Sequence, residues 1–228
     1  MSDQVTTVPS GAKDLHALGD LSTLPQHPGI YGSAVVGELS RADIHALANL
    51  ARGATRILEF GCGGSTLAFA QFAAPSARIV SVETEPKWVD VTREKLARVQ
   101  CERRVEFLPY NEWKARLEAQ WAWFDLVFVD GLETERPRFA EDSWRMLQPG
   151  GVQAWHDCRW PQIVTGALQH VANHFQEVDV VQIGAGLRSN VMTISKRVEV
   201  PEHNDPDRGR TDDWMSAHAE LPKGWPVR

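Results

Sequence analysis

Acidic side chains recur where apolar segments of the chain end, and such groups can bind hydroxyls, hold a cation or take up a proton. Glu59 lies in the first of these segments, Glu83 ends the second, and Asp130 follows the fourth. The fifth segment ends at His156-Asp157, so that an imidazole joins the carboxylates. Imidazole and carboxylate groups serve as general acids and bases, and carboxylate oxygens bind hard cations. The segment ends therefore predict a chemical or ligand-binding site.

A glycine-rich turn directly follows Glu59. The turn contains Gly61 and Gly63, and Ser65-Thr66 then begin a helix-like segment. Glycine allows a tight turn and a close ligand approach, while the N–H groups of a helix start attract polar or anionic groups. A dinucleotide fingerprint would need a third glycine where Thr66 stands. The turn therefore predicts a nucleotide-like ligand and disfavours an NAD-binding oxidoreductase.

Alternating strand and helix patterns position these residues. Ser40 is a good helix N-cap, and Gly53 ends the first helical pattern. Further helices are expected at 66–72, 86–100, 112–120, 137–147 and 163–175. Strands are expected at 56–60, 78–82, 105–108, 124–129, 152–156, 178–183 and 190–195. This order predicts an α/β fold with a seven-stranded, mostly parallel sheet, helices on both faces and an antiparallel edge strand formed by a terminal hairpin.

Four phrases occur in an order and spacing that resemble a known family. They are LEFGCGGST, VSVETEPKWV, FDLVFVDG and LQPGGVQAWHD, and they lie within residues 57–157. The chain resembles class I S-adenosylmethionine (SAM)-dependent methyltransferases, in particular small-molecule O-methyltransferases with aspartate after strand four and His-Asp after strand five. The resemblance implies a Rossmann-like fold.

The resemblance also implies roles for the strand-end residues. The glycine turn would hold the methionine part of SAM, Glu83 the ribose, and Asn111 or Tyr110 the adenine. The cofactor-binding residues expected on this basis are Glu59, Gly61, Gly63, Ser65, Glu83, Asn111 and Asp130. For Glu83, the alternative is a solvated charge before a turn.

Asp130, His156 and Asp157 are the expected catalytic residues. His156 or Asp130 would remove the acceptor proton or position the acceptor, although Asp130 could instead cap a helix and His156 could be a hydrogen-bonded structural residue. Asp130 with Asp157 could hold Mg²⁺, but no third ligand is identifiable, so the metal is left open. Arg136 and Arg138 are interpreted as part of a solvated helix face.

The net charge and composition of the chain restrict the binding partners and cell compartment that we expect. The net charge of −6 disfavours nucleic acid, and no apolar run approaches the length of a membrane span. Three scattered cysteines and the lack of a signal pattern favour a cytoplasmic protein. Residues 1–38 are expected to form an arm, 39–196 the catalytic domain and 197–228 an extension. Trp214 and Trp225 in this extension would allow a homodimer.

The sequence thus predicts a SAM-dependent methyltransferase acting on a small molecule, with a hydroxyl group as the first choice of acceptor. One alternative is N-methylation of a protein or an amine. Another is a SAM-binding protein without turnover.

Overall fold

The computed structural model describes residues 27–28, 34–35, 39–184 and 189–198. Its main strands are β3 (Arg56–Phe60), β4 (Arg78–Glu83), β5 (Val105–Pro109), β6 (Phe124–Val129), β7 (Leu147–Trp155), β8 (Val178–Ile183) and β9 (Met192–Lys196). The α-helices are α1 (Arg41–Ala51), α2 (Gly64–Phe72), α3 (Pro86–Arg98), α4 (Trp113–Leu117), α5 (Arg136–Trp144) and α6 (Pro161–Asn173). Two single-turn 3₁₀ helices, η3 (Glu102–Arg104) and η4 (Glu133–Glu135), and the short pair β1 (His27–Pro28) and β2 (Ala34–Val35) complete the described elements.

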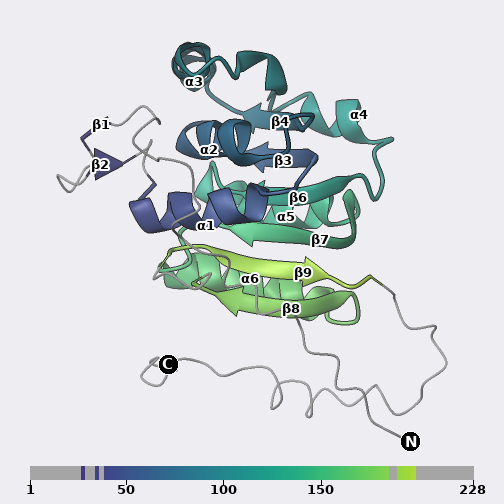
Figure 1. The fold of residues 1–228 in the computed structure, drawn as a ribbon. Helices are drawn as coiled ribbons and strands as arrows, with labels where there is room; N and C mark the ends of the chain where they lie inside the picture. The colour runs from purple at the N-terminus through teal and green to yellow at the C-terminus, as the bar shows by residue number, and fades with distance from the viewer. Residues whose placement is uncertain (1–26, 29–33, 36–38, 185–188, 199–228) are drawn as a thin grey trace, which may run out of the picture.

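One seven-stranded sheet organises the molecule, in the order β5-β4-β3-β6-β7-β9-β8 (Figure 1). The strands β5, β4, β3, β6 and β7 are parallel, whereas β9 runs antiparallel to both of its neighbours. The predicted fold class is therefore confirmed. The chain order reverses around β3, which lies between β4 and β6, and open α/β sheets bind ligands outside the carboxyl ends of strands at such a reversal.

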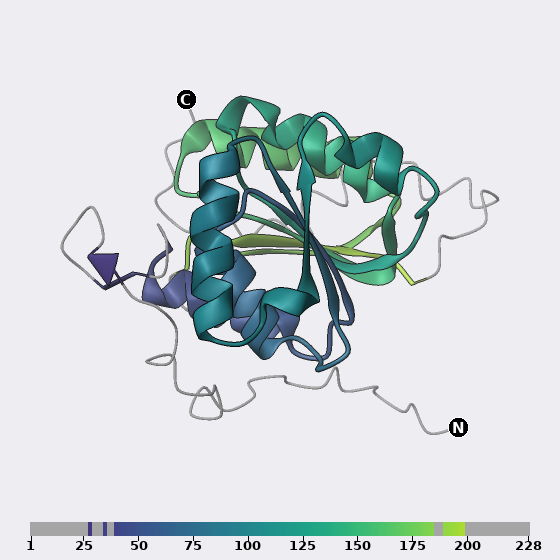
Figure 2. The same cartoon turned by 90° about the horizontal axis from the view of Figure 1, so that it is seen from above.

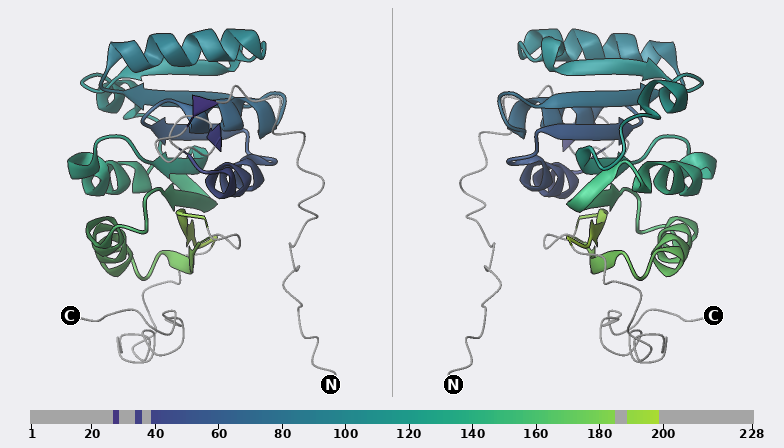
Figure 3. Two further views of the ribbon diagram at one scale, coloured as in Figure 1. Left: turned by 90° about the vertical axis from the view of Figure 1, so that its left-hand side faces the viewer. Right: turned by 90° about the vertical axis from the view of Figure 1, so that its right-hand side faces the viewer.

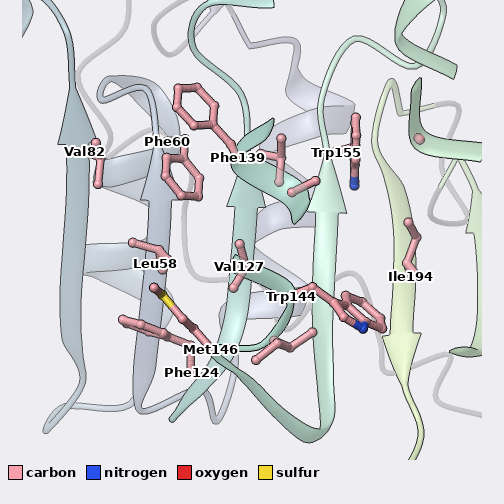
Figure 4. Packing of buried hydrophobic residues seen from close by; sticks show 14 of the residues in the cluster. Leu58, Phe60, Val82, Phe124, Val127, Phe139, Trp144, Met146, Trp155 and Ile194 are labelled. Carbon is pink, nitrogen blue, oxygen red and sulfur yellow. The ribbon is translucent and has the colours of Figure 1, made fainter. Parts of the chain in front are cut away.

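Helices cover both faces of the sheet (Figures 2 and 3). Residues of α4, α5 and α6 pack on one face together with Phe60, Phe124 and Trp155 (Figure 4). Residues of α1, α2 and α3 pack on the other face, around Ile57 and Phe128. The central strands are buried on both faces, which explains their nearly uninterrupted apolar sequences.

Several boundaries differ from the sequence prediction for identifiable reasons. The helix expected at 137–147 ends at Trp144, because Leu147 already pairs with Phe124 as the first residue of β7. The strand expected from residue 190 begins at Met192. Asn190 instead uses its side chain to bind Asp157 and the Arg159 N–H.

The expected arm at 1–38 and the extension at 197–228 lie almost wholly outside the described residues. The domain division stays a prediction. Among the described helices, none combines the length and apolar character needed to cross a lipid bilayer.

Candidate functional site

The glycine turn brings the ends of β3 and β6 into backbone contact. Gly61 has a φ angle of 90°, and a Cβ atom on it would lie 2.6 Å from the Gly131 nitrogen. Its own N–H donates to the Val82 carbonyl at the end of β4, at 2.8 Å. Only glycine fits this conformation and this close approach. The turn is thereby held at the carboxyl edge of three neighbouring strands.

Glu59 lies beneath the turn and is fully buried. Its carboxylate accepts hydrogen bonds from the hydroxyls of Ser65, Thr66 (2.7 Å) and Ser81 (2.7 Å). Thr66 Oγ1 also accepts the Gly63 N–H at 2.8 Å. Burial raises the pKa of Glu59 to about 7, although the three hydroxyl donors act in the opposite direction. The predicted residues Glu59, Gly63 and Ser65 therefore fasten the start of α2 from the inside.

Glu83 lies beside the same turn at the end of β4. Its Oε2 atom accepts the Cys62 N–H at 2.9 Å, and its Oε1 atom accepts the N–H groups of Thr84 and Glu85 at 2.7 and 3.0 Å. A carboxylate has about four lone-pair positions, so Oε2 keeps acceptor capacity for a further donor. The side chain is partly exposed and links the turn to the next strand end.

A hollow of about 520 Å³ opens next to Glu83. Its wall combines residues from β4, α3 and β5: Glu83, Thr84, Pro86, Val89, Asp90, Arg93, Phe107, Leu108, Pro109, Tyr110 and Asn111. The structure thus brings together Glu83, Tyr110 and Asn111, which were predicted as cofactor residues from separate segments. The Tyr110 hydroxyl donates to Glu135 at 2.6 Å, so its ring edge is fixed in place.

Asp130 and Asp157 face one another across the ends of β6 and β7, and Arg136 joins them. Arg136 Nη2 donates to Asp130 Oδ1 at 2.6 Å and to Asp157 Oδ2 at 3.0 Å. The guanidinium also donates to the carbonyls of Gly131 (3.2 Å) and His156 (3.3 Å). The Arg136 side chain is only 4% exposed, whereas the two carboxylates keep 21% and 25% exposure. The arginine therefore lies on the protein side of the pair.

Arg136 overturns one interpretation made from the sequence. It was assigned to a solvated helix face, and the structure buries it between two aspartates. Arg136 is the first residue of α5, one position before the predicted start of this helix, and the helix dipole disfavours a cation there. Such a cation is stable there when nearby carboxylates compensate it.

His156 lies below the carboxylates. Its Nδ1 atom is 3.3 Å from Asp130 Oδ2 and 3.6 Å from Asp157 Oδ1, and its Nε2 atom is 3.7 Å from Asp43 Oδ2. Burial alone would lower the pKa of His156. The carboxylates of Asp130, Asp43 and Asp157 outweigh burial and raise that pKa to about 10. The predicted trio Asp130, His156 and Asp157 is thus assembled around a protonated imidazole.

Two further residues of this network, Asp43 and Asn190, were not identified from the sequence. Asp43 accepts the Ser40 N–H and the Asn190 N–H, and it lies in the first turn of α1. Burial would raise the pKa of Asp43, but His156, Ser40 and Asn190 together lower it to about 2. The Ser40-x-x-Asp43 spacing signalled a capping box, whereas the contact with Asn190 depends on tertiary packing.

The donor set of Asp130, His156 and Asp157 has the spacing of a metal site, since ligand atoms of all three lie within 4.8 Å of one another. The oxygens are nevertheless engaged by protein donors. Arg136 binds one oxygen of each aspartate, Asn190 Nδ2 binds Asp157 Oδ1 at 3.1 Å, and His156 faces Asp130 Oδ2. The residues as arranged therefore do not fit a resident Mg²⁺.

Comparisons with known proteins agree with this geometry. Residues 58–158 match the model of a family described as a methyltransferase domain. A catechol O-methyltransferase from Mycobacterium tuberculosis is 32% identical over 101 residues, which cover 43% of this chain and 46% of that protein. The chain thus spans less than half the length of this curated relative. The predicted resemblance to class I SAM-dependent methyltransferases is confirmed.

Solved structures share the fold. An O-methyltransferase from Bacillus cereus in complex with S-adenosylhomocysteine (SAH) superposes with a TM-score of 0.58 at 21% identity, over 69% of this chain and 82% of that one. An O-methyltransferase from Streptomyces achromogenes in complex with SAM gives 0.53 at 20% identity, over 70% and 80% of the two chains. At this level of identity, the likeness concerns the fold.

Proposed function

We propose that this protein is a SAM-dependent methyltransferase that methylates a hydroxyl group of a small molecule. The observation that carries the proposal is that Glu83 both binds the glycine turn, through the Cys62 N–H, and lines the adjoining hollow. It lies inside the segment that matches the methyltransferase model. Relatives named as O-methyltransferases, two of them in complex with SAM or SAH, support the choice of cofactor and of an oxygen acceptor.

Each part of SAM has a chemically suitable partner in this proposal. The turn at Gly61 and Gly63 leaves space for the methionine part, and the start of α2 directly after the turn presents helix N-terminal N–H groups to it. The Glu83 carboxylate accepts hydrogen bonds from the ribose hydroxyls, and Asn111 lines the hollow that would receive the adenine. Glu59 and Ser65 act indirectly, since they are buried and position the turn.

Methyl transfer forms a bond between the acceptor oxygen and the methyl carbon as the bond from sulfur to that carbon breaks. SAH leaves as a neutral sulfide, and the acceptor proton passes to an oxygen of the partly exposed Asp130 carboxylate. The sulfonium methyl is already activated, so orientation of the acceptor supplies much of the rate. His156 is protonated and therefore serves as a hydrogen-bond donor, while Asp130 and Asp157 offer carboxylate oxygens at the surface.

Exposed apolar side chains next to these carboxylates support a small apolar acceptor. Trp160, which precedes α6, is 53% exposed, and Leu132, two residues after Asp130, is 54% exposed. Trp121 is also exposed, but it lies before β6, at the amino end of the strand that Asp130 follows. Trp160 and Leu132 are the proposed walls of the acceptor site.

The test is product analysis by mass spectrometry after incubation with SAM and a panel of phenols, catechols and amines. We expect a methyl ether and stoichiometric SAH. Trp160→Ala is expected to raise the acceptor KM about tenfold through lost aromatic contact, with Trp121→Ala as the unchanged control. Methylation of amines alone would replace oxygen by nitrogen as the acceptor. SAH binding without turnover on any acceptor would favour a non-catalytic SAM-binding protein.

The cellular location and the oligomeric state of the protein stay predictions. All three cysteines, Cys62, Cys101 and Cys158, are free thiols, as the expected cytoplasmic location requires. The proposed homodimer draws on the segment after residue 197, which lies almost wholly outside the described residues.

A further inference from the structure

We propose that the guanidinium of Arg136 takes the place of a divalent cation between Asp130 and Asp157, so that this site works without metal. The part of this inference that concerns turnover rests on the proposed function. The part that concerns cation binding depends only on the described contacts. Cation binding can therefore be measured even if no acceptor is found.

The first support is that every oxygen of the two carboxylates already has a protein partner. Arg136 Nη2 alone contacts an oxygen of each aspartate, at 2.6 and 3.0 Å. Asn190 holds a further oxygen of Asp157, and His156 Nδ1 lies 3.3 Å from the remaining oxygen of Asp130. A carboxylate oxygen can accept but cannot donate, so this His156 nitrogen carries a proton and lacks the lone pair that a metal needs.

The second support is the place of the arginine. The guanidinium is nearly fully buried and is held further by the carbonyls of Gly131 and His156. It extends from the first residue of α5, and that helix packs against α6 and the sheet. A buried arginine that bridges two carboxylates cannot move aside without leaving its own charge unpaired. A cation entering the site would have to displace this fixed charge.

A functional consequence follows for the acceptor. A hard cation bound by carboxylates keeps open positions that two adjacent hydroxyl oxygens can fill together. Arg136 has no such open positions and is already bound on the protein side. Acceptors with one hydroxyl are therefore expected to react as well as vicinal diols, when corrected for their pKa values.

The experiment measures Mn²⁺ and Mg²⁺ binding by calorimetry and thermal shift in the wild type, Arg136→Met, Arg136→Lys and Arg138→Met. Wild type, Arg136→Lys and Arg138→Met are expected to show no saturable binding. Arg136→Met leaves two carboxylates without their shared cation, so we expect saturable Mn²⁺ binding by this variant, with an affinity about tenfold or more above the upper limit that the wild-type titration sets. Adding Asp130→Asn to Arg136→Met should abolish the gain. Arg138 is the matched control, because it lies two residues away and its side chain is 66% exposed.

Saturable Mn²⁺ or Mg²⁺ binding by the wild type, lost on Asp130→Asn, would overturn the inference. Inhibition of wild-type turnover by a chelator, with recovery on adding Mg²⁺, would overturn it as well. If Arg136→Met fails to fold even with Mn²⁺ present, the wild-type titration decides the matter. Failure to find any acceptor would leave the cation measurements intact and would count against the proposed function alone.

Discussion

At the scale of single residues, Glu59 couples protonation to the stability of the cofactor turn. Its carboxyl is buried beneath three hydroxyl donors, and burial raises its pKa to about 7. A raised native pKa means that the folded protein binds the proton more tightly than the unfolded chain. The stabilising contribution is therefore complete below about pH 4.5 and is lost as the pH rises through about 7.

Glu59→Gln should remove this pH dependence. We expect the free energy of unfolding of the variant, minus that of the wild type, to increase between about pH 4.5 and pH 7 by on the order of 2–3 kcal/mol. Urea titrations at several pH values measure this difference. Glu118→Gln, on an exposed side chain after α4, is the control with a constant difference. A constant difference for Glu59→Gln as well would show that folding does not shift the pKa of Glu59.

At the scale of elements, the contact of β3 with β6 depends on Gly61. A Cβ atom there would meet backbone atoms of Gly131 at 2.6 and 2.7 Å, and backbone cannot rotate away as a side chain can. Gly53 is the matched comparison, because its φ of 81° is similar and a Cβ atom on it would meet nothing within 4 Å. A substitution at Gly53 therefore measures conformational strain alone, whereas a substitution at Gly61 adds a steric clash to the same strain.

Gly53→Ala is expected to cost about 1 kcal/mol, which is the usual penalty of a left-handed conformation. Gly61→Ala should cost at least about 3 kcal/mol, because strain and a backbone clash add. It should also weaken SAH binding, whereas Gly53→Ala should leave that affinity unchanged. Thermal denaturation measures the loss of stability, and calorimetry measures the SAH affinity. Equal costs at the two sites would mean that β3 and β6 separate readily and that the turn is not held as described.

At the scale of the whole molecule, the order of elements was readable from the sequence because each strand and helix carries its own local pattern. The apolar run of β6 and the amphipathic α3 belong to this readable part. The strand-end residues Glu83, Asp130 and His156 were also found, because parallel strands place their carboxyl ends at one edge.

Contacts between distant segments were not readable. Asp43 meets the Asn190 N–H across 147 positions of the chain. No pattern near either residue indicates the other. Arg136 was misread because a charged residue in a helical pattern is normally solvated. Its burial depends on how β6 and β7 align two carboxylates above it, and this is a property of the assembled sheet.

The most direct measurement is the calorimetric titration of SAH into the wild type, Glu83→Ala and Glu85→Ala. We expect wild-type affinity in about the micromolar range and a loss on the order of 100-fold in Glu83→Ala, because two hydroxyl hydrogen bonds to a carboxylate disappear. Glu85→Ala should bind like the wild type, since Glu85 is exposed two residues further along. Thermal melts would confirm that each variant is folded. Absence of SAH binding by the folded wild type, or equal binding by all three proteins, would contradict the assignment of this site to SAM.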